Sequence, residues 1–341
     1  MRLSDFHFTL PEHLIAKYPL EKRTASRLLC LQTKVATEVH RQFTDVMHLI
    51  EPGDLLIFNN TKVLPARIIG KKITGGRVEM LIERVIDDKR VLAQMRASKS
   101  LRIGEELYFG DYIFRVLTKK SPFYELILMT ETNVIKVVDQ IGQIPIPPYL
   151  GRNTEEIDVE RYQTVYANPP GSVAAPTAGL HFDENLLKEL QQKGVDLAEL
   201  TLHIGAGTFL PVRTEDITKH RMHAEYFEIS DSLCKKIASC QSRGKRVIAV
   251  GTTTLRALET ASISGQIQPY AGDTSIFIYP GFVFHCVDIL ITNLHLSGSS
   301  LLMLVAAFGG YEKVMCAYEE AVKASYRFYS YGDAMWVERQ R

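Results

Sequence analysis

The stretch between residues 62 and 135 consists of short runs of apolar or alternating residues. These runs lie at residues 66–70, 77–83, 91–95, 106–109, 112–116 and 124–128. Turn-forming pairs such as Gly75-Gly76, Asp87-Asp88 and Gly110-Asp111 separate them. Short strands with such close turns are typical of an antiparallel sheet or a small barrel. We therefore predict a small antiparallel β-barrel here, followed by an amphipathic helix at 134–141.

The segments on either side alternate between strand-like and helix-like patterns. Beyond a buried strand at 53–58, we expect helices at 183–193, 230–243, 252–262 and 299–326, and strands at 197–204, 246–250, 276–279 and 289–294. The last of these helices has a weak point at Gly309-Gly310. This order predicts a discontinuous α/β domain, residues 1–61 plus 146–341, with the β-barrel domain inserted at 62–145.

Composition is compatible with this organisation. A chain of 341 residues suggests two domains at about 150 residues each. The 46 % hydrophobic and 23 % charged content is typical of a globular protein. The amino terminus lacks the apolar core of a signal peptide, and no apolar run approaches the roughly 20 residues of a membrane span. We expect a cytoplasmic protein with no membrane association, and a monomer, since no heptad pattern demands a partner.

Charge is distributed unevenly along the chain. The net charge of +1 argues at first against a nucleic-acid binder. Between Lys62 and Arg102, however, eleven basic and four acidic residues give +7, so the remaining chain carries −6. Cations gathered on one surface attract a polyanion. A merely solvated basic sheet explains the charge equally well at this point.

Three long stretches, at 162–182, 200–212 and 289–311, contain no Lys, Arg, Asp or Glu. They are rich in Gly, Ser, Thr, Asn or His. Small polar residues beside apolar ones suit a pocket that brings the backbone close to a small molecule. A glycine-rich core is the alternative for any one stretch, but three in the same α/β domain favour a binding site.

Two loops in or beside these stretches could contact a ligand. The pair Gly205 and Gly207 follows a strand, but the third glycine of a dinucleotide fingerprint is missing and Pro211 prevents the helix that should follow. Elsewhere, Thr252 and Thr253 open a helix after a buried strand, a position that favours an anionic group. Arg256 could complete a carboxylate clamp there, although Thr252 could equally serve as an ordinary helix cap.

Histidines are the candidates for proton transfer. His223 and Glu225 stand two positions apart, which on a strand puts both on one face, where they could relay a proton. Each single histidine is more commonly a structural residue. The five cysteines include no Cys-x-x-Cys pair, which argues against disulfides or structural zinc. Since no ligand spacing for any other metal occurs either, we expect no metal.

Eight motifs, in consistent order from near one end of the chain to the other, carry a resemblance to a known family. They are FNNTKVLPAR at 58–67, RYQTVY at 161–166, VAAPTAGLHF at 173–182, LHIGAGTFLP at 202–211, MHAEY at 222–226, AVGTT at 249–253, FIYPGF at 277–282 and YSYGDAM at 329–335. Together they resemble the S-adenosylmethionine:tRNA ribosyltransferase-isomerases of queuosine biosynthesis.

The resemblance implies an unusual use of S-adenosylmethionine. Its ribosyl part is transferred and isomerised onto the aminomethyl group of 7-aminomethyl-7-deazaguanine at the wobble position of a tRNA anticodon. Adenine and methionine leave, and the product is epoxyqueuosine in tRNA. The implied partners are tRNA and S-adenosylmethionine, which is a substrate, and neither a prosthetic group nor a metal is implied.

Set against this chemistry, the candidate residues form three groups. We expect proton transfer from His203, His223 and Glu225. We expect substrate contacts from Gly205, Gly207, Thr208, Thr252, Thr253, Arg256, Asn293, His295, His181 and Tyr162. We expect tRNA phosphates on Arg67, Lys71, Lys72, Arg77, Arg90, Arg96, Lys99 and Arg102. The alternatives are an S-adenosylmethionine-dependent RNA methyltransferase and a non-catalytic RNA-binding protein.

Overall fold

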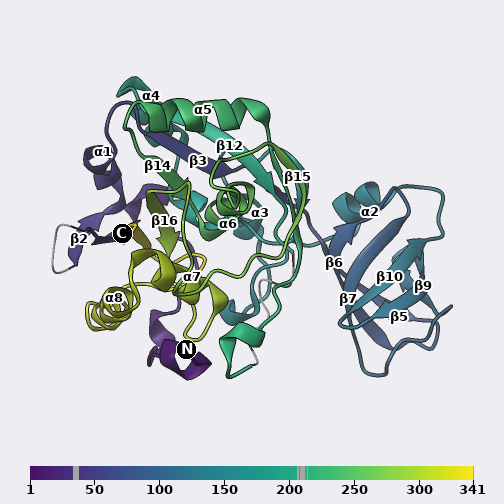
Figure 1. Cartoon of the computed structure of the whole chain (residues 1–341). Coiled ribbons are helices and arrows are strands. Elements are labelled where there is room, and N and C mark those ends of the chain that lie inside the picture. Colours follow the sequence, from purple (N-terminus) through teal and green to yellow (C-terminus); the bar gives the residue numbers. More distant parts are fainter. Residues whose placement is uncertain (34–37, 206, 208–211, 213, 341) are drawn as a thin grey trace.

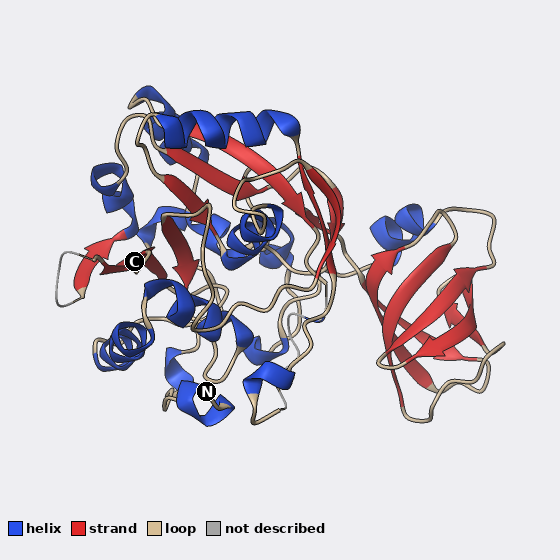
Figure 2. Ribbon diagram, viewed as in Figure 1, coloured by secondary structure: helices blue, strands red, loops and turns tan. Residues whose placement is uncertain are grey.

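A nine-stranded mixed sheet and a separate six-stranded barrel form the molecule (Figures 1 and 2). The computed structural model describes residues 1–33, 38–205, 207, 212 and 214–340. The strand order of the sheet is β15-β13-β12-β3-β14-β16-β17-β1-β2. Its strands are β1 (Arg27–Leu31), β2 (Val39–Gln42), β3 (Leu55–Asn59), β12 (Asp196–Leu202), β13 (Glu225–Ile229), β14 (Val247–Val250), β15 (Tyr270–Thr274), β16 (Ile289–Asn293) and β17 (Ala334–Glu338).

The centre of the sheet is parallel, with β12, β3, β14 and β16 side by side in the same direction. Strands β3, β14 and β16 are buried along their whole length, as expected when both faces are covered. The helices of the domain are α1 (Val46–Leu49), α3 (Glu156–Arg161), α4 (Glu184–Gln192), α5 (Asp231–Ser242), α6 (Thr252–Ala261), α7 (Ser300–Gly309) and α8 (Tyr311–Lys323).

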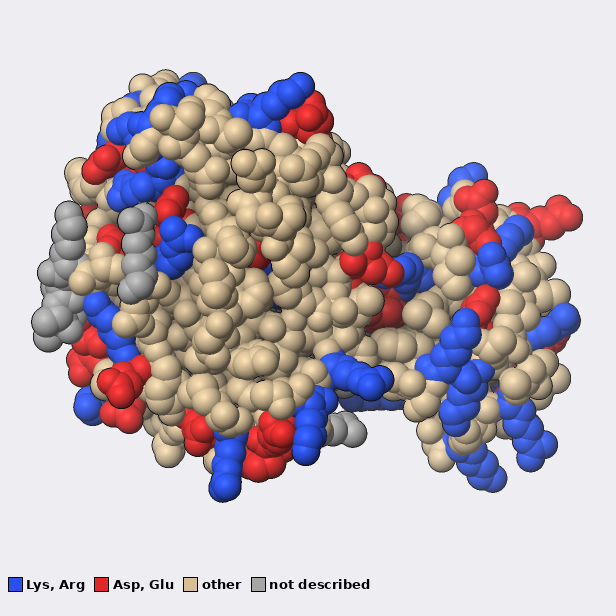
Figure 3. Space-filling model, viewed as in Figure 1, with Lys and Arg blue, Asp and Glu red and all other residues tan. Residues whose placement is uncertain are grey.

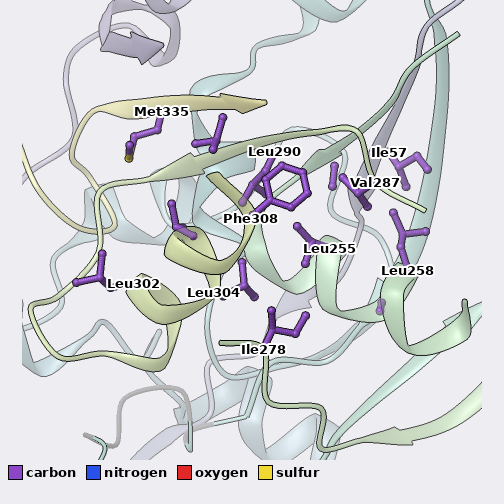
Figure 4. Packing of buried hydrophobic residues seen from close by; sticks show 14 of the residues in the cluster. Ile57, Leu255, Leu258, Ile278, Val287, Leu290, Leu302, Leu304, Phe308 and Met335 are labelled. Atoms are coloured by element: carbon purple, nitrogen blue, oxygen red, sulfur yellow. The ribbon is translucent and has the colours of Figure 1, made fainter. Parts of the chain in front are cut away.

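Two apolar layers bury the two faces of this sheet. On one face, Leu255 and Leu258 of α6 and Phe308 of α7 pack against Ile57 and Leu290 of the strands (Figure 4). On the other face, α4 and the short helix at Thr177–His181 pack against the alternate side chains of β3, β14 and β16. Polar groups at the strand ends are therefore held by a rigid frame.

Local sequence signals explain several helix ends. Asp183 accepts the Leu186 N–H at 2.8 Å at the start of α4, and Ser230 accepts the Leu233 N–H at the start of α5. The long helix expected at 299–326 is in fact two helices that meet at 118°. Gly310, which has φ +89°, separates them because only glycine adopts this conformation easily.

The inserted barrel confirms the predicted fold class. Its strands are β5 (Arg67–Lys72), β6 (Arg77–Val85), β7 (Arg90–Ala97), β8 (Glu106–Phe109), β9 (Tyr112–Lys120) and β10 (Phe123–Leu128), closed in the order β10-β7-β6-β5-β8-β9. It has a core of its own, and α2 (Val134–Ile141) packs onto it. The domain limits 62–145 remain a prediction. A short parallel pair, β4 (Lys62–Val63) with β11 (Pro170–Ser172), lies at the junction with the main domain.

Two features of the sheet differ from the expectations. Residues 276–279 form no strand, and the edge strand is instead β15 at Tyr270–Thr274. Strands β1, β2 and β17 were not expected and extend the sheet on its other side. No single helix among the described residues is long and apolar enough to cross a membrane, and the pair α7 and α8 passes that test only as a bent pair.

Candidate active site

A cavity of about 680 Å³ opens at the carboxyl ends of β14 and β16. This is where open α/β sheets bind ligands. Its wall combines the strand ends with the first residues of α6 and α7 and the start of β13. The barrel also reaches it, because Ser121 and Pro122 of the β9–β10 turn form part of the lining.

A buried ion pair lies in the cavity wall. Nη1 of Arg256 donates to Oε2 of Glu225, and the two residues are 4 % and 6 % exposed. The guanidinium comes from α6 and the carboxylate from β13. Nη2 of Arg256 is buried with no hydrogen-bond partner among the described residues. The pair therefore balances its buried charges but leaves one guanidinium nitrogen without an acceptor.

Two helices begin at the same cavity. Helix α6 starts at Thr252 after Gly251, and no side chain caps its first N–H groups. Helix α7 starts at Ser300 and is capped by Ser299, which accepts the Leu302 N–H at 3.2 Å. Both amino-terminal turns line the cavity, so their dipoles favour negative charge inside it.

His223 and Glu225 both line the cavity, but β13 begins only at Glu225, so the two do not share a strand as their spacing predicted. The His223 ring also meets the barrel, since its centroid lies 5.9 Å from that of Phe123 in an edge-to-face arrangement. Gly207 packs against the same side chain, where a Cβ would come within 2.7 Å of the ring. His223 therefore lies where the two domains meet.

The structure does not bring His203 to this cavity. Its N–H donates to the carbonyl of Tyr226 at 2.9 Å, and its ring stacks on the Tyr226 ring. His203 and Tyr226 are paired across antiparallel strands, so their side chains lie on the same face of the sheet. Glu225 precedes Tyr226 on β13, so its side chain points to the opposite face. The Nδ1 atom bonds the Thr61 hydroxyl at 2.8 Å, and burial lowers the pKa of the ring. This placement corrects the expectation that His203 joins His223 and Glu225.

The remaining predicted contacts divide between wall and interior. Thr253, Asn293, His295 and Tyr162 line the cavity. The His295 Nε2 atom bonds the Thr292 hydroxyl at 2.8 Å, and burial lowers the pKa of His295 to about 3. Burial raises the pKa of Tyr162 well above its usual value. These two side chains are neutral parts of the wall.

His181 and Gly205 lie outside the lining, each for a packing reason. His181 is buried behind the wall, where its Nε2 atom contacts the Asn293 amide at 3.2 Å. Gly205 faces the barrel, because a Cβ there would come within 2.0 Å of Glu83. Both placements correct the expectation of direct substrate contact. Thr208 lies outside the described residues.

Five of the predicted phosphate contacts lie at one end of the barrel. They are exposed and form no ion pair among the described residues, and we call them the basic end: Lys71, Arg77, Arg96, Lys99 and Arg102. Lys71 pairs with Arg77 across β5 and β6, and β10 begins opposite Gln94, close to Arg96 on β7. The basic end is therefore the end that carries the cavity-lining β9–β10 turn. Figure 3 shows Lys and Arg gathered over part of the barrel surface.

Three predicted phosphate contacts are instead engaged within the barrel. Arg67 pairs with Glu79 at 2.9 Å, and Arg90 with Asp87 at 2.7 Å. Lys72 is only 9 % exposed, and its ammonium contacts Glu105 at 3.1 Å. Sequence charge alone did not reveal these pairs, because most of the carboxylates come from other strands or loops.

Comparison with known proteins gives the family. A profile described as queuosine biosynthesis protein matches residues 3–337. The chain belongs to the queuosine biosynthesis protein family. It is also similar to a solved structure, the S-adenosylmethionine tRNA ribosyltransferase of Thermotoga maritima. That chain is 34 % identical, the match covers 97 % of this chain and 99 % of that one, and the TM-score is 0.56.

The cavity wall contains further residues that the sequence did not indicate. Tyr149 and Ser330 are hydrogen-bonded to each other at 2.5 Å in the lining, and Tyr329 lies beside them. The Y-S-Y motif at 329–331 was noted for the family resemblance, but nothing in its spacing indicated a position in the wall. Among the described residues, no group of three His, Cys, Asp or Glu side chains could hold a metal ion.

Proposed function

We propose that this protein transfers and isomerises the ribosyl part of S-adenosylmethionine onto the aminomethyl group of 7-aminomethyl-7-deazaguanine in tRNA. Adenine and methionine are released, and epoxyqueuosine at the wobble position is the product. One observation carries the proposal within the family: the basic end of the barrel adjoins a cavity that contains a buried ion pair and two helix amino termini.

The cavity suits the charge pattern of S-adenosylmethionine. The methionine carboxylate binds Nη2 of Arg256, which has no partner among the described residues, together with the first N–H groups of α6 at Thr252 and Thr253. The cationic sulfonium lies near Glu225, whose carboxylate is held in the wall by Arg256. Gly207 lines the cavity, where a glycine lets the backbone come close to the adenosine. No resident cofactor takes part.

Two ionisable side chains of the cavity lining, His223 and Glu225, are available for proton transfer. The carbon beside the sulfonium must lose a proton, adenine must gain one, and the attacking amine must be neutral. We assign these transfers to His223 and Glu225, of which Glu225 has Oε2 occupied by Arg256. His203 has no part in this assignment. Since the sulfonium already activates its neighbour, the protein needs to supply only position and proton transfer.

The tRNA contacts are assigned to the basic end. Its five cations take backbone phosphates, which position the anticodon arm, while the modified base leaves the stack and enters the cavity past the β9–β10 turn. The location in the cytoplasm, where such a tRNA occurs, and the monomeric state belong to the same proposal.

Product analysis tests the proposal. Purified protein is incubated with S-adenosylmethionine and tRNA that carries the aminomethyl precursor, and the small molecules are separated by chromatography. We expect adenine and methionine in equal amounts. S-adenosylhomocysteine would instead indicate an RNA methyltransferase, and tRNA binding without any product would indicate a non-catalytic RNA-binding protein.

A further inference from the structure

The side-chain amide of Asn293 has one possible orientation. Asn293 ends β16 in the cavity wall and is 2 % exposed. Its Nδ2 atom lies 3.0 Å from the carbonyl oxygen of Tyr329. A carbonyl can only accept, so the amide nitrogen and not the amide oxygen must face it. The opposite orientation would place two acceptors against each other.

This orientation determines the state of His181. The second Nδ2 hydrogen of Asn293 points to Nε2 of His181 at 3.2 Å, so Nε2 must be an unprotonated acceptor. The proton of the neutral ring is then on Nδ1, which donates to the Ser26 hydroxyl at 2.7 Å. Burial, with the charges of Arg327 and Arg23, lowers the pKa of His181 to about 3. His181 is therefore a neutral acceptor in the physiological range.

The same arrangement leaves Oδ1 of Asn293 without a donor. It is buried and has no hydrogen-bond partner among the described residues, and both donors of the amide are already used. A buried acceptor in a cavity wall gains its partner when a ligand with an N–H or O–H group binds. An amide that is fixed before binding needs no reorientation at that step.

We infer that Oδ1 of Asn293 accepts a hydrogen bond from a donor group of a substrate, and that His181 is a positioning residue that fixes this oxygen. The inference rests on the proposed function. S-adenosylmethionine and the modified base both carry amino groups that could donate this hydrogen bond. The donor is the substrate whose affinity falls in the variants described below.

The first test removes the acceptor. In Asn293→Leu, the affinity for S-adenosylmethionine or for precursor tRNA should fall by about tenfold, the value of one hydrogen bond in a buried site. Isothermal titration with each substrate separately identifies the donor. Wild-type affinity for both substrates and wild-type turnover in this variant would overturn the inference.

The second test acts through His181, which does not line the cavity. We expect His181→Phe to reproduce the same loss and His181→Gln to restore most of the affinity, since a glutamine oxygen reaches the Nε2 position. His40→Phe, at a histidine bonded to Tyr326 away from the cavity, is the matched control and should bind both substrates normally. Equal affinities in the Phe and Gln variants of His181 would contradict the positioning role.

A spectroscopic measurement keeps the inference testable even if a variant does not fold. Nitrogen-15 NMR of labelled histidine in the wild-type protein should show His181 as the neutral tautomer protonated on Nδ1. Protonation on Nε2 would overturn the hydrogen-bond arrangement. Failure of the proposed function is distinguishable, because a wild-type protein that releases no adenine would still give the same tautomer.

Discussion

Replacing Arg256 by methionine should strongly destabilise the main domain. The substitution keeps the approximate length of the side chain but leaves the Glu225 carboxylate, which is 6 % exposed, without its cation. An unpaired buried charge of this kind costs about 3–5 kcal/mol. The double variant Glu225→Gln/Arg256→Met, which removes both charges, should recover a large part of that loss. Together with the single variant Glu225→Gln, these two variants complete a double-mutant cycle that measures the coupling energy of the pair.

The assay can follow the correct domain because the chain contains a single tryptophan. Trp336 is buried on β17 in the same sheet, so its fluorescence during urea unfolding reports on the main domain and not on the barrel. We expect a lower urea midpoint for Arg256→Met with an unchanged slope. A loss below about 1 kcal/mol, which is the range of exposed pairs, would refute the reasoning from burial.

Three further predictions follow from other parts of the structure. Alanine at all five cations of the basic end should lower tRNA affinity. It should also reduce the slope of the logarithm of the binding constant against the logarithm of the salt concentration by about 4, and an unchanged slope would place the tRNA elsewhere. Gly310→Ala should cost about 1–3 kcal/mol in urea unfolding, because φ is +89° there, while Gly76→Ala, at a glycine with ordinary φ, should change little. In the folded protein the pKa of His295 is lowered to about 3, whereas in the unfolded chain it is about 6.5. As the pH falls below about 6.5, the unfolded chain therefore takes up a proton that the folded protein does not, and the folded protein loses stability. Between about pH 6 and 4, the free energy of unfolding of His295→Gln should therefore fall less steeply than that of the wild type, by about 1.4 kcal/mol per pH unit. Equal slopes for the two proteins would contradict this pKa.

The sequence predicted those parts of the fold that depend on local patterns. Short runs of alternating apolar and polar residues predicted the barrel strands, and capping residues predicted where α4 and α5 begin. Strands β1 and β17 were missed, because a short buried strand and a buried loop have the same apolar pattern until their partners are known. Strand β2 was missed because it is short, polar and half-exposed. The split between α7 and α8 was signalled by Gly310, but its angle depends on packing against β17.

The candidate site was predictable in composition and less so in geometry. Uncharged stretches from three parts of the chain do supply residues to one cavity. The contact between Arg256 and Glu225 was not foreseen, since it joins a helix and a strand that are distant in sequence. The strand pairing of His203 with Tyr226 likewise sends this histidine to the other face, which its position beside a glycine motif could not indicate.

Transfer of label from doubly labelled S-adenosylmethionine tests the central claim most directly. The donor carries radiocarbon in the ribosyl part and tritium in the S-methyl group, and the acceptor is precursor tRNA. The account predicts that tRNA gains radiocarbon and no tritium, and that the five-alanine variant of the basic end transfers much less at low tRNA concentration. Tritium in the tRNA, or radiocarbon that never enters it, would contradict the account.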